Sequence, residues 1–207
     1  MSVEYFPIDK FQLIETPFYY YDIPLLYSTI NEIKKEIANE PFVVHYALKA
    51  NSNARLLQEI SSSGLGADCV SGNEIKKAVD CGFDPAQIVF AGVGKTDNEI
   101  NLGLDLNIFS FNVESLHELK VLNELAKAKK KVARVALRIN PNIDANTHSY
   151  ITTGLEENKF GIEEDQFLKI LGILPDLSFI DFIGVHFHIG SQISDMNVYQ
   201  NLCYKIN

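Results

Sequence analysis

The chain has 207 residues, enough for one domain with a well-buried core, and its hydrophobic and charged fractions of 46% and 22% are those of an ordinary globular protein. The formal net charge of −9 argues against nucleic acid as the main partner, because phosphate binding needs clustered Lys and Arg. No apolar run approaches the roughly 18 residues needed to span a bilayer, and residues 1–10 lack the pattern of a secretory signal. We therefore expect neither a membrane partner nor secretion.

The cysteines and the one basic run add little chemistry. Cys69, Cys81 and Cys203 are an odd number without metal-ligand spacing, so we expect reduced thiols and a cytoplasmic location. The basic run 127–131 ends a helical pattern, where cations stabilise the last turn, and we interpret it in that way.

After a lead-in segment over residues 1–41, short apolar runs alternate with amphipathic stretches from residue 42 to the end, which we take as one domain. Most of the runs are rich in Val, Ile, Phe and Tyr, as buried parallel strands are. The expected strands are 42–48, 67–70, 88–91, 108–111, 132–139 and 180–188. The expected helices are 54–63, 73–80, 97–104, 114–129, 164–172 and a last one from about 197.

Helix boundary signals support this alternation. Ser71 with Glu74 and Thr96 with Glu99 have capping-box spacing, and Gly82 stands where a helix needs a left-handed exit. Strands alternating with helices through short links indicate an α/β fold with a parallel, helix-covered sheet. Six such units fit either an open doubly wound sheet or six-eighths of a (β/α)8 barrel, and the pattern alone favours neither.

The long polar connection 140–161 interrupts the rhythm. Loops of this length in a compact domain are usually functional or disordered. This one follows the C-terminal end of a strand, where parallel α/β proteins place their sites. We expect it to belong to the functional site.

Lys49 is the first candidate catalytic residue, because it follows the expected strand 42–48 at its C-terminal end. Alternation along the strand would direct it to the same face as His45 and Ala47, into a barrel if there is one. Desolvation at that position would suit Schiff-base chemistry. The alternative is a lysine that simply extends into solvent.

His186 and His188 form an H-x-H pair at the end of the last expected strand, so both rings would project to one face. The two histidines could be metal ligands, one of their rings could pack on a flat cofactor, or both could be hydrogen-bonded histidines of the core. Gly190 and Ser191 follow, where a phosphate could bind. A metal site would need further ligands at other strand ends, and Asp68 is the only acid expected there, so we expect no metal.

Two further sets of residues are candidate sites. Asp68 and Arg138 are an acid and a base near strand ends, and they could pair with each other or hold a polar cofactor. Residues 92–96 resemble the end of a phosphate-binding P-loop, but the pattern needs a glycine where Val89 stands. We therefore interpret Thr96 as a helix cap.

Five motifs, in one order along the chain, carry a family resemblance: YALKANSN at 46–53, GADCVS at 66–71, RINPNID at 138–144, TG to ENKFGI at 153–162 and HFHIGSQ at 186–192. From about residue 16 to its end the chain resembles the diaminopimelate decarboxylases, within the barrel-type, ornithine-decarboxylase-like group of pyridoxal-phosphate enzymes. The segment 140–162 resembles this branch more than the ornithine or arginine branches.

The resemblance implies roles residue by residue. Lys49 matches the lysine that binds pyridoxal 5'-phosphate covalently, His188 the histidine stacked on its ring, and Ser191 a hydroxyl near its phosphate. His186 matches no residue of known role. Other polar residues would shape the site: Asp68, Arg138 and Lys159.

The resemblance also implies a (β/α)8 TIM-like barrel with about six of its eight units present and the C-terminal β domain absent. The activity implied is decarboxylation of meso-diaminopimelate to L-lysine, by a carboxy-lyase that is a homodimer when complete. We expect the 207 residues alone to be inactive, because the family's glycine-rich phosphate loop and the acid on the pyridine nitrogen lie beyond them. Their first and last strands would also leave open edges that self-associate.

Three alternatives remain open. The chain could be a non-catalytic pyridoxal-phosphate-binding or interaction module of the same family, or a decarboxylase of a related basic amino acid. A barrel metal hydrolase is a more distant possibility. Visible absorbance after addition of the cofactor separates the family from the hydrolase, and activity separates the enzyme from the module.

Overall fold

The computed structural model describes residues 6–141, 160–191 and 193–206. The chain divides into two compact units, Met1–Phe42 and Val43–Asn207. No helix in the described ranges is long and apolar enough to cross a membrane.

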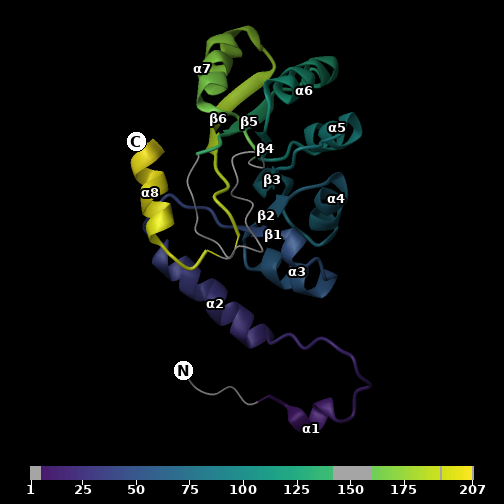
Figure 1. The fold of residues 1–207 in the computed structure, drawn as a ribbon. Helices are drawn as coiled ribbons and strands as arrows, with labels where there is room; N and C mark the ends of the chain where they lie inside the picture. Colours follow the sequence, from purple (N-terminus) through teal and green to yellow (C-terminus); the bar gives the residue numbers. More distant parts are fainter. Residues whose placement is uncertain (1–5, 142–159, 192, 207) are drawn as a thin grey trace. The chain divides into compact units, whose positions relative to one another are not determined.

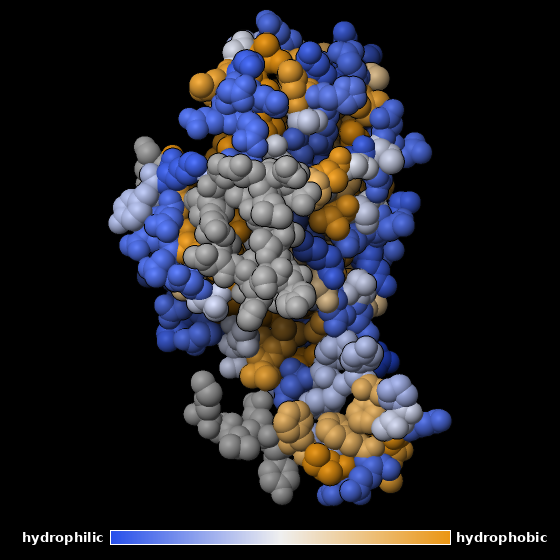
Figure 2. Space-filling view, viewed as in Figure 1, coloured by the Kyte–Doolittle hydropathy of each residue, from blue (hydrophilic) through white to orange (hydrophobic). Residues whose placement is uncertain are grey.

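The first unit contains two helices, α1 (Ile8–Phe11) and α2 (Ile23–Glu36), of which the sequence analysis anticipated neither. The Asp22 side chain caps α2 by accepting a hydrogen bond from the Leu25 amide at 2.9 Å. Rings of Phe11 and Tyr20 pack edge to face, with their centroids 5.0 Å apart. The unit leaves large apolar and aromatic side chains exposed, and orange, hydrophobic residues are visible on the surface in Figure 2. The exposed side chains include Phe6, Ile8, Leu13 and Tyr19.

The second unit is built on a six-stranded parallel sheet. Its strands are β1 (His45–Ala47), β2 (Gly66–Cys69), β3 (Ile88–Phe90), β4 (Ser110–Val113), β5 (Ala133–Arg138) and β6 (Ile180–His186). They pair strictly in chain order, each with the next. A doubly wound sheet must reverse its strand order at a switch point. This sheet does not reverse, so the barrel interpretation is confirmed and the doubly wound alternative is wrong.

Helices connect successive strands, and α3–α6 lie along one face of the sheet in Figure 1. They are α3 (Ala54–Ser62), α4 (Gly72–Asp80), α5 (Asp97–Leu106), α6 (Leu116–Lys129) and α7 (Glu164–Ile173), and α8 (Asn197–Ile206) follows the last strand, β6. Short 3-10 turns lie at η1 (Leu48–Ala50), η2 (Pro85–Gln87) and η4 (Leu174–Asp176).

The helix caps agree in part with the predicted ones. Thr96 and Glu99 form a complete capping box at the start of α5, so the assignment of Thr96 as a helix cap is confirmed. Ser71 caps α4 by accepting from the Glu74 amide at 3.2 Å. Glu74 accepts instead from the Val70 amide at 2.6 Å, so that second box is not reciprocal.

The core lies between the sheet and the helices. Alternate strand residues and the inner faces of the helices are fully buried there, including Leu57, Ile60, Ala67, Cys69, Ile75, Ile88, Phe90, Leu119, Val135, Leu137 and Ile170. Because strand side chains alternate between faces, residues between these, such as Asp68, face away from the helix layer. The sheet therefore presents its polar strand positions on the side opposite the helices.

The boundaries of β1 and β6 differ from the predicted ones at positions that bear on the site. β1 covers only 45–47, since its partner β2 begins at Gly66 and offers no ladder to Phe42 and Val43, which are 64% and 67% exposed. β6 ends at His186, where its pairing with Arg138 of β5 ends. Consequently Lys49 lies in η1 and His188 lies beyond β6.

Candidate functional site

The C-terminal ends of the six strands carry a polar cluster, as parallel α/β folds arrange their sites. Its members come from consecutive units: Lys49 after β1, Asp68 on β2, Lys95 after β3, Glu114 after β4, Arg138 at the end of β5, and His186 and His188 at and after the end of β6. In the ladder register Arg138 lies directly opposite His186, so their side chains leave the sheet on the same side.

A buried ion pair between Glu114 and Arg138 is the central contact. Arg138 Nη1 donates to Glu114 Oε2 at 2.7 Å, and the two side chains are 12% and 5% exposed. The second oxygen, Glu114 Oε1, accepts from the Gly92 amide at 3.1 Å. Gly92 has a φ of 119°, a region that favours glycine, and a Cβ there would lie 3.2 Å from the Val70 carbonyl oxygen. The carboxylate is thus held by both the β3 and the β5 ends.

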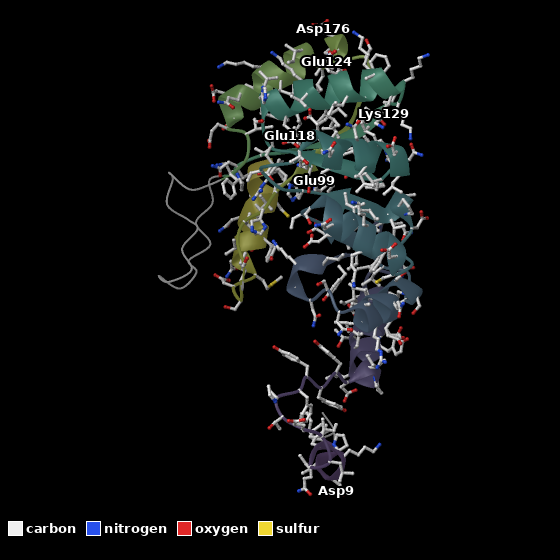
Figure 3. All side chains as sticks on the ribbon, turned by 90° about the vertical axis from the view of Figure 1, so that its right-hand side faces the viewer. Asp9, Glu99, Glu118, Glu124, Lys129 and Asp176 are labelled. Carbon is white, nitrogen blue, oxygen red and sulfur yellow. The ribbon has the colours of Figure 1, made fainter. Side chains whose placement is uncertain are left out.

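A second ion pair supports the first. Lys95 Nζ donates to Glu118 Oε1 at 2.7 Å and to the carbonyl oxygens of Gly92 and Asn112, both at 2.8 Å. Glu118 Oε2 accepts from the Glu114 amide at 2.9 Å. The Lys95 side chain is 1% exposed, and these three acceptors match its three donors. Figure 3 labels Glu118 at one end of α6 and Lys129 at the other.

Asp68 and Lys49 form a separate acid–amine pair of charges at the β1–β2 side of the cluster. Burial raises the pKa of the Asp68 carboxyl, the charge of Lys49 opposes that rise, and Glu74 adds to it. Of the two alternatives for Asp68 and Arg138, a pair with each other or a polar cofactor, the first is not seen in the described chain, since Arg138 binds Glu114. Lys49 is exposed, so the burial that we expected for it is absent in the described chain.

The two histidines differ in burial. Burial lowers the pKa of His186 to about 4, with Arg138, His188 and Lys95 adding to the effect. Burial also lowers the pKa of His188, helped by Arg138 and Lys49 and opposed by Glu114. Both rings are therefore neutral at pH 7. His186 Nδ1 is buried and, among the described residues, has no hydrogen-bond partner.

The remaining predicted positions are partly described. Ser191 is exposed and follows Gly190, whose φ of 136° allows the sharp change of direction after β6. Lys159 lies outside the described residues. The predicted loop is anchored at both ends, because the Asn140 amide donates to the Ile162 carbonyl at 3.0 Å and the Ile162 amide to the Arg138 carbonyl at 2.8 Å.

Sequence reasoning missed Glu114, Glu118 and Lys95. Glu114 and Glu118 were assigned to the helical pattern 114–129, whereas α6 begins at Leu116 and Glu114 is 8% exposed at a strand end. The available signal was the Ser cap: Ser115 and Glu118 have the same spacing as Ser71 and Glu74, which places Glu114 before the helix. Across the described residues, no group of three or more His, Cys, Asp or Glu side chains is arranged to hold a metal ion.

A parallel barrel-type sheet with an amine, two neutral imidazoles and a buried guanidinium–carboxylate pair at its strand ends is typical of barrel enzymes that hold an organic cofactor. Residues 25–206 match the family model described as pyridoxal-dependent decarboxylase, pyridoxal binding domain. The chain belongs to this family. The expected family and its barrel fold are thereby confirmed, and so is pyridoxal phosphate as the family's cofactor.

Relatives and solved structures similar to this chain include two diaminopimelate decarboxylases and an arginine decarboxylase. Diaminopimelate decarboxylase of Bacteroides thetaiotaomicron is 55% identical over 98% of this chain and 53% of its own length. The crystal structure of the Helicobacter pylori diaminopimelate decarboxylase complexed with L-lysine is 43% identical, with a TM-score of 0.90 over 96% of this chain and 50% of that one. A Chlorella virus arginine decarboxylase is more distant, at 28% identity and a TM-score of 0.68 over 83% of this chain and 44% of that one. The chain spans about half the length of the curated relatives it matches.

Proposed function

We propose that this chain is the cofactor-binding part of a pyridoxal-phosphate-dependent carboxy-lyase that decarboxylates meso-diaminopimelate to L-lysine. The observation that carries the proposal is the 55% identity to a diaminopimelate decarboxylase over 98% of the chain. The substrate branch is supported by the contrast with the arginine decarboxylase, which is only 28% identical.

The residues at the strand ends fit pyridoxal phosphate. The cofactor needs an amine for attachment, an uncharged surface for its ring and donors for its anionic groups. Lys49 offers an accessible primary amine next to the Asp68 charge, and His188 offers a neutral ring. Ser191 offers an exposed hydroxyl, and Arg138 a guanidinium already fixed by Glu114.

We assign the following roles. Lys49 would hold the cofactor covalently, His188 would lie against its ring, and Ser191 would donate to its phosphate. Asp68 and Arg138 would bind its polar substituents. His188 is chosen over His186 because it is the more accessible ring and follows the strand end beside Gly190 and Ser191.

When bound, pyridoxal phosphate supplies an electron sink for the pair released as the substrate's carboxylate leaves. The chain's own residues bind and orient. Asp68 lies close enough to Lys49 for the lysine charge to lower the pKa of its carboxyl, and Lys49 is accessible enough to exchange with a substrate amine. The neutral His188 adds no positive charge that would compete for the released electrons. Arg138 offers a fixed positive charge to an anionic atom.

Covalent labelling tests the assignment of Lys49. The full-length product of the gene is incubated with pyridoxal phosphate, reduced with borohydride, digested and mapped. The label is expected on the peptide containing Lys49 and not on that containing Lys95, whose amine is saturated by three acceptors. Label elsewhere with Lys49 clean, or no label at all, would refute the assignment.

Activity measurements test the choice of substrate and the roles of the two histidines. Carbon dioxide and lysine should form from meso-diaminopimelate and not from arginine or ornithine, and no turnover would favour a non-catalytic module. His188→Ala should weaken cofactor retention and rate far more than His186→Ala. Equal effects would contradict the role given to His188.

The same proposal includes coarser properties of the protein. Residues 42–207 would be the pyridoxal-phosphate-binding domain and 1–41 a lead-in, in line with the division of the chain at 42 and 43. The complete enzyme would be a homodimer. A cytoplasmic location is supported by the three free cysteines. Size measurement by light scattering tests the dimer.

A further inference from the structure

We propose that Glu114 is a positioning residue for the candidate site: it fixes the guanidinium of Arg138 so that Arg138 meets the cofactor in one orientation. This inference rests on the proposed function, in which Arg138 binds a polar substituent of pyridoxal phosphate. Glu114 itself would not touch the cofactor.

Both carboxylate oxygens of Glu114 accept hydrogen bonds from within the protein. Its Oε2 accepts from Arg138 Nη1 and its Oε1 from the Gly92 amide, at 2.7 and 3.1 Å. The side chain is only 5% exposed, so an ionised carboxylate there depends on these donors. Loss of either contact would leave a buried charge partly unpaired, which is energetically costly. This cost keeps Glu114 and Arg138 paired.

An ion-pair partner limits the conformations of the long Arg138 side chain. It lies at the end of β5 opposite His186, and its guanidinium carbon is 5.8 Å from the centre of the Phe160 ring. Glu114 is the one carboxylate among the described residues that forms an ion pair with it. A long side chain without that anchor would sample several rotamers, and ordering it on ligand binding would weaken the affinity.

The network behind Glu114 makes the anchor rigid. Glu118 accepts from the Glu114 amide at 2.9 Å and pairs with Lys95, which in turn binds the carbonyl oxygens of Gly92 and Asn112. Three successive strand ends, β3, β4 and β5, are thereby joined. Two acids and two bases balance the charge, so the network adds no net charge to the site.

The competing interpretation is a purely structural ion pair that joins β4 to β5. Both interpretations predict some loss of stability when Glu114 changes, so stability alone does not separate them. They differ in cofactor affinity, because only a positioning residue acts on the ligand through Arg138.

A double-mutant cycle in the full-length product separates the two. Wild type, Glu114→Gln, Arg138→Gln and the double variant are titrated with pyridoxal phosphate by absorbance, and their unfolding is measured in urea. Glu114→Gln is expected to raise the cofactor dissociation constant on the order of 10- to 100-fold, since the loss of a hydrogen bond to a charged group changes an equilibrium constant by about that factor. In the Arg138→Gln background the same change is expected to have no further effect.

Asp105→Asn is the matched control. Asp105 pairs with Lys129 at 2.7 Å, as close as the Glu114 pair, and Lys129 lies at the end of α6 opposite Glu118 (Figure 3). The control removes an ion pair of the same length and should leave the dissociation constant unchanged. Glu118→Gln is a second test variant, expected to weaken binding several-fold and only while Arg138 is present.

The outcomes are distinguishable. If wild type binds no cofactor or is not labelled at Lys49, the proposed function fails. If wild type binds and Glu114→Gln binds equally well, or loses as much affinity without Arg138 as with it, the positioning role is overturned. Should Glu114→Gln yield no folded protein, the dependence of Glu118→Gln on Arg138 decides in the same way.

Discussion

His186 is expected to make the protein less stable in mildly acidic solution. Its pKa is lowered from 6.5 to about 4 by burial, with Arg138, His188 and Lys95 adding to the effect. The folded ring therefore binds a proton more weakly than the unfolded ring, and protonation favours unfolding. The free energy of unfolding is unaffected well above the unfolded pKa of 6.5 and falls as the pH drops from there toward about 4.

The size of the effect follows from these two pKa values. At pH 5 the unfolded ring is almost fully protonated, while the folded ring is mostly neutral. For one such group the linkage relation gives a loss of about 2 kcal/mol between pH 7.5 and pH 5. Complete protonation of both states would bring the loss to about 3 kcal/mol, since one pKa unit corresponds to about 1.4 kcal/mol.

The assay is urea unfolding of wild type, His186→Gln and His117→Gln at pH 7.5 and pH 5. The loss of stability between the two pH values should be about 2 kcal/mol smaller in His186→Gln than in wild type. His117 lies exposed on α6, so His117→Gln should retain the wild-type pH dependence. The lowered pKa values of His45 and His188 contribute equally to all three proteins. Unchanged acid sensitivity in His186→Gln would refute the reasoning.

Two further predictions concern glycines and thiols. Gly103→Ala on α5 should cost about 1–3 kcal/mol, because its Cβ would lie 2.7 Å from the Phe111 ring, whereas Gly172→Ala on α7, which meets nothing within 4 Å, should stabilise by about 0.5–1 kcal/mol. Thermal unfolding checks both, and equal signs would contradict the steric argument. Exposed Cys203 should react rapidly with a thiol reagent at pH 8, whereas Cys69, whose pKa burial raises to about 12, should react only after unfolding. Mass mapping over time measures the two rates.

The order of elements could be predicted from the sequence because hydrophobic periodicity is a local property. All six strands and the helices of the second unit were found from it, with boundaries shifted by a few residues. The barrel could not be separated from a doubly wound sheet, because both are made of the same βα units. They differ only in which strand pairs with which, and that depends on contacts between distant residues.

Strand ends were harder to predict than strand interiors. Phe42 and Val43 have the composition of a strand, but pairing begins at the neighbour's first residue, Gly66. A strand extends only over the residues that its neighbouring strand can pair with. At its other end β1 stops at Ala47, and Lys49 lies in the turn η1, so period-two alternation could not give its surroundings.

Glu114 was missed for a reason that another unit of the same chain makes plain. After β2 and after β4 the sequence repeats one pattern: a residue X, a Ser cap and a Glu three residues later. In both units the Ser caps the helix and the Glu side chain accepts from the amide of X, at 2.6 Å for Val70 and 2.9 Å for Glu114. The scaffold is therefore the same, and X is the position that it presents at the strand end. Val70 there is 38% exposed and its side chain is apolar, whereas Glu114 is 8% exposed and its side chain binds Arg138. In the β4 unit this single position supplies the partner of Arg138. Helical periodicity assigns Glu114 to the helix, whereas the geometry of the turn places it at the site.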